Sequence, residues 1–296
     1  MLHPGWVFSV GVVGIACAGL FLRLAQPAPP VVVGFYRMAI ASVVLIAALG
    51  IRRLRARAGG QLAELAVSRR DVVLALLAGA LFGTDIALWH HALVRTSIAN
   101  ATLLVNTTPI HVGLFTTLVL RQPLGGGFAL GAGLALAGAA VLLGVELGDP
   151  RAVQGDALAL AAALFYTGYI LVMTRARATL DALTAITCMS LAAASVLGFY
   201  GLVLGDAFRG FPLQSWLAIG AAAVISQLIG AFAIVWAVRF MPPPFTAVAL
   251  VAQPVVATAL AWWWLGESVS ASQAAGALSV LAGIAIVSRD ERTRAG

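Results

Sequence analysis

Residues 127–145 read GFALGAGLALAGAAVLLGV, and residues 271–288 read ASQAAGALSVLAGIAIVS. Two glycines of the first stretch and a proline upstream of it recur at one separation of 145 residues: Gly131 as Gly276, Gly138 as Gly283 and Pro109 as Pro254. The correspondence continues without a gap between residues 98–120 and residues 243–265. A fixed period of this kind is the mark of duplicated structural units. The chain therefore consists of two related halves.

The composition excludes a soluble protein. The chain of 296 residues is 61% hydrophobic and 10% charged, and its mean hydropathy is +1.01. A soluble domain is roughly 45–50% apolar and about 25% charged. Because no soluble fold buries this much apolar surface, the composition predicts an integral membrane protein.

Ten continuous apolar runs have the length of about 20 residues that a helix needs to cross roughly 30 Å of hydrocarbon. They cover residues 6–24, 31–50, 72–93, 98–120, 127–145, 154–174, 182–204, 213–238, 244–265 and 271–288. Transmembrane barrel strands would instead alternate over about ten residues. We therefore predict an all-α integral membrane protein with ten transmembrane helices.

These helices divide equally between two repeats, which we place at residues 1–148 and 149–296. Each repeat holds five helices, and an odd number of crossings turns the second copy upside down in the bilayer. Inverted repeats of this kind are a transporter architecture. The only sizeable hydrophilic stretch, residues 51–71, is predicted to be a cytoplasmic connector, so no soluble catalytic or regulatory domain fits.

Arginine placement predicts the orientation in the membrane. All 18 basic residues are arginine. The ten-helix topology places 13 of them on one side: Arg52, Arg53, Arg55, Arg57, Arg69, Arg70, Arg121, Arg175, Arg177, Arg239, Arg289, Arg292 and Arg294. The other side has four: Arg23, Arg95, Arg151 and Arg209. The positive-inside rule then predicts a multi-pass protein of a bacterial-type inner membrane with both termini in the cytoplasm. The high pI reflects this bias, and no basic patch interleaved with aromatic residues indicates nucleic-acid binding.

The sequence contains no enzyme motif. A nucleophile elbow, a P-loop, a dinucleotide fingerprint and a His-Glu-x-x-His metal pattern are all missing. Cys17 and Cys188 both fall inside predicted helices and indicate neither a disulfide nor a metal site. We expect no enzymatic activity, no cofactor and no metal. The alternatives are a membrane enzyme acting on a lipid-linked substrate and a receptor or scaffold.

Polar groups inside hydrocarbon are expensive, so each one is a candidate for function. Asp85 is the only acid well inside a predicted helix, and it shares a helical stripe with Trp89. It is a candidate site for a proton or a substrate ammonium group; the alternative is a structural carboxylate bonded to a neighbouring helix or to Arg37. The adjacent pair His90 and His91 is expected near the outer surface, where a solvated interfacial role competes with ligand binding.

Residues 98–120 form the most polar predicted helix, with Asn106, Thr108 and His111 around Pro109. Thr108 corresponds to Gln253, and each directly precedes its proline, Pro109 or Pro254. A proline frees a backbone carbonyl inside a helix. We therefore predict two kinked helices that gate access and meet near the midplane, where transporters bind substrate. The alternative is that these polar side chains only join helices.

Two further predictions concern aromatic and small residues. Tyr166 and Tyr169, with Gln227 and Trp236, are candidates for an aromatic wall and a hydrogen bond to a small ligand. The glycines of residues 127–145 and 271–288 permit close helix packing, either within the bundle or across a dimer. Packing within a monomer is favoured.

The chain resembles the drug/metabolite transporter superfamily, specifically its ten-helix EamA-type exporters. The matching features are Phe35-Tyr36-Arg37-Met38, the run Ala92…Thr102…Pro109, its echo Ala237…Ala247…Pro254, and Leu265-Gly266-Glu267 before the last helix. The first repeat has Gln122 where the family has a glutamate. Within the family the chain is similar to the YddG-type amino-acid exporters. The resemblance implies export of small metabolites, often amino acids, through a central cavity.

We therefore expect an exporter of small metabolites, amino acids first and aromatic or apolar ones included, that works by alternating access. The alternative substrates are other small organic solutes or cations. The expected partners are this substrate and the lipid bilayer, and the expected state is a monomer.

Overall fold

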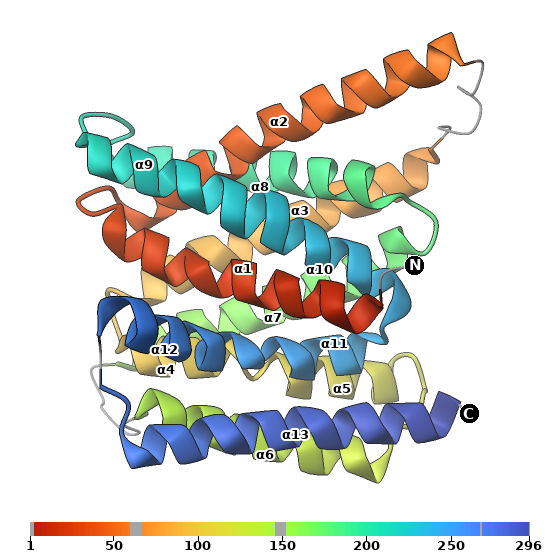
Figure 1. Cartoon of the computed structure of the whole chain (residues 1–296), viewed down its shortest axis with the longest axis vertical. Coiled ribbons are helices and arrows are strands. Elements are labelled where there is room, and N and C mark those ends of the chain that lie inside the picture. The colour runs from red at the N-terminus through yellow and green to blue at the C-terminus, as the bar shows by residue number, and fades with distance from the viewer. Residues whose placement is uncertain (1–2, 60–66, 146–151, 267, 296) are drawn as a thin grey trace. The chain divides into compact units, whose positions relative to one another are not determined.

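The computed structural model describes residues 3–59, 67–145, 152–266 and 268–295, and these residues form helices and no strand (Figure 1). The elements are α1 (Pro4–Leu24), α2 (Pro30–Ala58), α3 (Arg69–Ala92), α4 (Ile98–Val105), α5 (Thr108–Leu118), α6 (Gly126–Leu143), α7 (Val153–Arg177), α8 (Ala182–Leu204), α9 (Leu213–Ala221), η2 (Ala222–Ala231), α10 (Phe232–Ala237), η3 (Val238–Phe240), α11 (Pro243–Leu250), α12 (Ala252–Leu265) and α13 (Ala271–Ala295).

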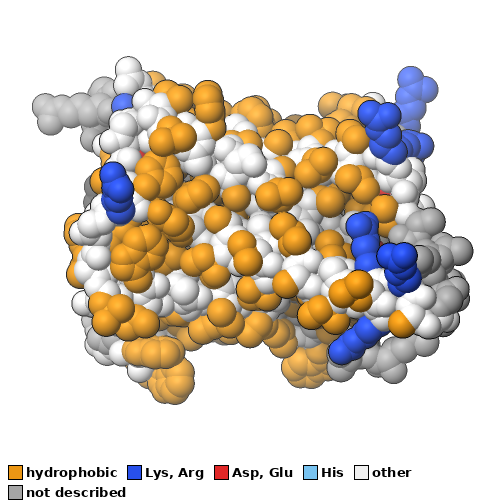
Figure 2. All heavy atoms as spheres, turned by 90° about the horizontal axis from the view of Figure 1, so that it is seen from above, with side chains coloured by type: hydrophobic (Ala, Val, Ile, Leu, Met, Phe, Trp, Pro, Cys, Tyr) orange, Lys and Arg blue, Asp and Glu red, His pale blue; other side chains and the backbone are white. Residues whose placement is uncertain are grey.

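The helices confirm the predicted fold class. Nine segments of the described chain are long and apolar enough to span a membrane. The tenth predicted segment, residues 98–120, is the broken pair α4 and α5, whose pieces are each too short to span alone. Large hydrophobic side chains lie on the outside of the protein, and on the face drawn in Figure 2 the basic side chains gather near its edges. The protein is an all-helical integral membrane protein.

The prediction that residues 51–71 form a connector was wrong for its first part. Helix α2 continues to Ala58 and ends at Gly59. Arginine and leucine are good helix formers, and the first Gly-Gly pair comes only at residues 59–60. Hydropathy shows where the apolar run ends. The helix continues beyond that point because the arginines that follow have high helix propensity.

The helices belong to two compact units. One contains residues 1–84 and 172–240, and the other contains residues 85–171 and 241–296. Each unit combines segments from both halves of the sequence. The predicted repeat boundary at residues 148 and 149 lies outside the described residues, and the division into repeats at that point stays a prediction.

In the unit of residues 1–84 and 172–240, glycines allow α1 to pack closely on η2. A Cβ added to Gly14 would lie 2.6 Å from the Cα of Gly230, and one added to Gly11 would lie 3.0 Å from the carbonyl oxygen of Gly230. Segment η2 is a π-helix of 10 residues. Such wider turns are rare and are often found at functional sites.

In the unit of residues 85–171 and 241–296, α6 packs along α13 (Figure 1). A Cβ on Gly131 would lie 2.5 Å from the carbonyl oxygen of Gly283, and a Cβ on Gly138 would lie 2.6 Å from that of Gly276. The early glycine of each helix thus meets the late glycine of the other, so the helices are antiparallel. The 145-residue repeat relates Gly131 to Gly276 and Gly138 to Gly283, so it converts each of these two contacts into the other. A pair of contacts related in this way is the pattern of a two-fold axis.

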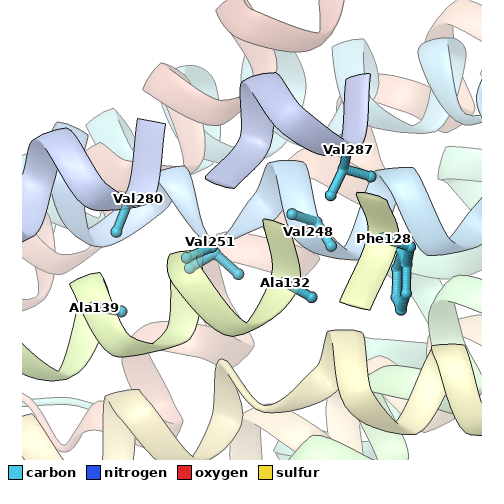
Figure 3. Packing of buried hydrophobic residues seen from close by; sticks show 8 residues of the cluster. Phe128, Ala132, Ala139, Val248, Val251, Val280 and Val287 are labelled. Atoms are coloured by element: carbon cyan, nitrogen blue, oxygen red, sulfur yellow. The ribbon is translucent and has the colours of Figure 1, made fainter. Parts of the chain in front are cut away.

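This glycine contact decides between the two packing alternatives for residues 127–145 and 271–288. The glycines are used inside one chain, where they let two backbones approach closely. Ser279 Oγ also donates a hydrogen bond of 3.0 Å to the carbonyl oxygen of Leu134, its own repeat equivalent. Figure 3 shows the apolar side chains of the same cluster, which come from three helices: Phe128, Ala132 and Ala139 of α6, Val248 and Val251 at α11, and Val280 and Val287 of α13.

Candidate functional site

Two helix breaks define the candidate site, and both lie in the unit of residues 85–171 and 241–296. Helix α4 ends at Val105, four residues before Pro109, and α11 ends at Leu250, four residues before Pro254. A proline lacks an N–H, and its ring clashes with the carbonyl four residues earlier. The proline therefore sets the position of each break. Helix α5 packs against α11, so the two broken helices are neighbours.

Local side chains close the first break. Thr108 Oγ1 donates to the carbonyl oxygen of Val105 at 2.7 Å, which is the carbonyl that Pro109 leaves without its helical donor. Thr107 Oγ1 donates to Leu104 at 2.6 Å, and Asn106 Nδ2 donates to Thr102 at 2.8 Å. These bonds stabilise the end of α4. They occupy the donors of Asn106 and Thr108, whose predicted role as substrate ligands stays a prediction.

The second break is joined differently. At the end of α11 the Val251 N–H donates to the carbonyl oxygen of Val248 at 3.1 Å. Gln253, the counterpart of Thr108, instead forms a side-chain hydrogen bond with Tyr166 of α7. The second break is thereby joined to another helix.

Tyr166 belongs to a buried polar group. Its ring stacks on that of Tyr169, one turn later in α7, with 5.6 Å between ring centroids and 23° between planes. The Asp85 carboxyl group of α3 interacts electrostatically with both phenols. Three of the predicted residues, Asp85, Tyr166 and Gln253, are thus brought together with Tyr169.

Asp85 is the acid of this group and is only 6% exposed. Its Oδ1 atom is buried, and it has no hydrogen-bond partner in the described chain. A buried polar atom without a partner costs roughly 1–3 kcal/mol. Such an acceptor, within electrostatic reach of two phenols, is suited to a ligand that brings N–H donors.

Trp89 and the histidines occupy different surroundings. Trp89 packs in an apolar cluster with α4 and α7 that is centred on Ala92, Ala101 and Ala159. His90 is 7% exposed, so the expectation of a solvated interfacial histidine was wrong for this residue. Its ring lies against Trp89, with centroids 5.2 Å apart. The sequence predicted exposure of His90 because it lies near a helix end. Its position in the helix does not show which neighbouring residues bury it.

His111 is half-buried on α5, and its Nδ1 atom lacks a hydrogen-bond partner within the described residues. It is the third residue after the start of α5 and follows Pro109 by two positions. The structure therefore places it at the first break, where its predicted ligand role remains a prediction.

Gln227 and Trp236 belong to the other compact unit. Gln227 is 1% exposed in the π-helical segment η2, and its Nε2 atom donates to Ser190 Oγ at 2.9 Å. Its amide therefore joins η2 to α8. Trp236 stacks on Phe240 with centroids 4.9 Å apart. These contacts are within that unit, and a substrate role for either residue remains a prediction.

One charged cluster was not anticipated from the sequence. Arg52 of α2 binds Asp181 with distances of 2.6 and 3.2 Å and Thr184 with 3.1 Å. Burial acts to raise the pKa of Asp181, but hydrogen bonds from Arg52 and Thr184 outweigh it and hold that pKa at about 2. Asp181 also caps α8 by accepting from the Thr184 backbone N–H. An aspartate directly before an apolar run is an N-cap signal that could have indicated it.

The search for metal-binding groups gives no candidate within the described residues, where no three His, Cys, Asp or Glu side chains gather. The site described above is therefore made of oxygen and amide groups from α3, α7 and α12.

The comparisons with known proteins agree with this architecture. The model of the EamA-like transporter family matches residues 5–144 and again residues 153–289. The chain belongs to the EamA-like transporter family. It is therefore a multi-pass membrane transporter of the drug/metabolite type, built from two repeated halves. A solved structure described as "Crystal structure of protein" is 21% identical, covers 97% of both chains and has a TM-score of 0.78, which shows the same fold. No curated protein matches the chain.

Proposed function

We propose that this EamA-family transporter exports small zwitterionic metabolites, amino acids first, across a bacterial-type inner membrane by alternating access of its two inverted repeats. The proposal includes cytoplasmic termini and no enzymatic activity. The observation that carries it is the buried Asp85 carboxyl beside the stacked phenols of Tyr166 and Tyr169.

This group matches the chemistry of a primary ammonium. An ammonium group has three N–H donors and no acceptor. Asp85 supplies an acceptor without a partner among the described residues, and Tyr166 and Tyr169 supply two phenolic oxygens within its electrostatic reach. Hydrogen bonds between charged groups are roughly twice as strong as neutral ones. The ammonium end of an amino acid is therefore assigned to Asp85.

The carboxylate group of a bound amino acid would require N–H donors close to Asp85. The Gln253 amide, which bonds to Tyr166, and the backbone N–H groups of Ala252 and Gln253 at the start of α12 are the donors proposed for it, since a helix N-terminus favours an anion. The rings of Tyr166 and Tyr169 then face the apolar remainder of the substrate. A site with these three parts accepts zwitterions and includes aromatic and apolar amino acids.

Transport into proteoliposomes of the purified protein tests this function. We expect counterflow of radiolabelled amino acids and little movement of a quaternary organic cation. Movement of the cation without any amino acid would overturn the substrate class. Comparing rates with and without an imposed pH gradient then separates proton coupling from facilitated diffusion.

The variant Asp85→Asn tests the assigned residue. It keeps the size of the side chain but removes the charge that binds the ammonium group, so we expect amino-acid transport to fall by at least tenfold. The matched control is Asp206→Asn, the same change in the loop after α8, with transport unchanged. Full transport by Asp85→Asn would assign Asp85 to structure alone.

A further inference from the structure

The C-terminal end of α2 extends beyond α8, the helix on which it packs (Figure 1). At about 1.5 Å per residue, the 29 residues of α2 span about 43 Å, or about 40 Å along the membrane normal at a tilt of about 20°. The hydrocarbon is only about 30 Å thick. The last two turns, residues 51–58, therefore lie at the depth of the lipid headgroups.

The contacts of Arg52 and Ala56 show which side of these turns faces the protein. Arg52 is held by Asp181 and Thr184, and Ala56, one turn later, is buried. At about 100° per residue, the opposite side presents Ile51 and Leu54. These two side chains are 52% and 68% exposed. The outward side of the helix end therefore carries two exposed apolar side chains, and Arg57 lies as close to its centre line as Ile51 does.

Three more arginines, Arg53, Arg55 and Arg57, flank this apolar strip and are exposed. None of their guanidinium groups forms an ion pair or hydrogen bond with another described residue. Arginine binds phosphate oxygens in a bidentate manner and is the preferred residue for such groups. Three guanidinium groups without a partner among the described residues thus form an anion-binding surface.

We propose that residues 51–58 bind anionic phospholipid, with Arg53, Arg55 and Arg57 on the headgroup phosphates and Ile51 and Leu54 among the first acyl carbons. A free phosphate or a soluble polyanion would satisfy the arginines but leave Leu54 in water. A lipid satisfies both, because its charge and its hydrocarbon are joined at the depth that this helix end reaches. This surface is independent of the transport site.

Lipid binding to the full-length protein tests the proposal. The protein in detergent is titrated with phosphatidylglycerol or phosphatidylcholine, and bound lipids are counted by native mass spectrometry. We expect preferential binding of phosphatidylglycerol. The triple variant Arg53→Gln/Arg55→Gln/Arg57→Gln should lose roughly fivefold in affinity per arginine, or about a hundredfold in all, from about 1 kcal/mol per charge.

The matched control replaces three exposed arginines elsewhere in the same unit, Arg175→Gln/Arg209→Gln/Arg239→Gln, and should retain the preference. The variant Arg53→Lys/Arg55→Lys/Arg57→Lys keeps the charge but loses the bidentate geometry, so it should bind more weakly than the native protein and more tightly than the glutamine variant. Equal binding of phosphatidylglycerol by the native protein and the glutamine variant overturns the proposal. Displacement of the lipid by millimolar inorganic phosphate, or full binding by Leu54→Ser, would show a simple anion site and overturn it too.

Discussion

The two helix breaks, between α4 and α5 and between α11 and α12, have the same geometry and different chemistry. Each helix stops four residues before a proline, at Val105 or Leu250. The first break is closed by hydroxyl and amide groups of its own segment, whereas the second sends Gln253 to Tyr166 on another helix. Both repeats therefore contain the same proline break. The residues that differ between them, Thr108 and Gln253, give the two breaks different hydrogen-bonding partners.

This difference assigns unequal roles to the breaks. A local hydrogen bond contributes about 1 kcal/mol, so three of them at the first break hold it in one conformation. At the second break, Gln253 bonds instead to Tyr166, which belongs to the group around Asp85. We therefore expect substitutions at the second break to change transport and those at the first to change stability.

The largest expected effect comes from Pro254→Ala. The new N–H can bond to the Leu250 carbonyl and rejoin α11 to α12, which moves Gln253 away from Tyr166. A displacement of about 1 Å at a binding site costs about a hundredfold in rate. The matched variant Pro109→Ala should lose about tenfold or less, because Thr108 still caps the first break. Initial rates in proteoliposomes measure both, and equal losses would remove the distinction.

The next effect concerns the bond between Gln253 and Tyr166. Gln253→Met and Tyr166→Phe each remove it with little change of volume, and each should lower transport about fivefold to tenfold, the equivalent of a bond worth roughly 1–1.5 kcal/mol. The double variant should be no worse than either single one, because both remove the same interaction. Fully additive losses would show that the two side chains act separately.

A smaller effect is expected at the first break. Thr108→Val removes the bond to the Val105 carbonyl and should lower the free energy of unfolding by about 1 kcal/mol. Transport by the folded protein should change less than twofold. Thr117→Val, on an exposed position of α5, is the control and should unfold like the native protein. If Thr108→Val had native stability and a large transport defect, the first break would instead be a site of substrate contact.

The smallest effect lies outside both breaks, at Asp181. Its pKa in the folded protein, about 2, is below the ordinary value of 3.8, so its pairing stabilises the fold above pH 4 and is lost as the pH falls towards 2. The pair is partly exposed, and solvent screening limits its contribution to less than about 1 kcal/mol. Asp181→Asn should lower the melting temperature in detergent at pH 7 but not at pH 2. An equal loss at both pH values would make the carboxylate charge irrelevant.

Much of the fold could be predicted because membrane helices follow from local composition. Apolar runs and the 145-residue period gave the spans and the repeat, and Pro109 and Pro254 gave the two breaks. The end of α2 could not be read from hydropathy, since arginine interrupts an apolar run without ending a helix. The π-helical turns around Gln227 pack closely on α1 at Gly14, a tertiary contact that a local pattern does not contain.

The candidate site was only partly predictable for the same reason. Asp85 and Gln253 stand out as polar residues in apolar surroundings, and the pair Tyr166 and Tyr169 lies one helical turn apart. That these residues meet depends on tertiary packing. The burial of His90 likewise depends on a covering neighbour, which its position near the end of α3 does not reveal.

The exchanged glycine contacts of α6 and α13 have a consequence for movement. If the two repeats trade conformations during transport, the operation that relates the two states is the pseudo-two-fold rotation. A two-fold rotation exchanges equivalent positions without changing the distance between them, and Ser279 and its equivalent Leu134 are such a pair in direct contact. The distance between spin labels at these two positions should therefore stay constant, and it is the reference for the changes measured at other pairs.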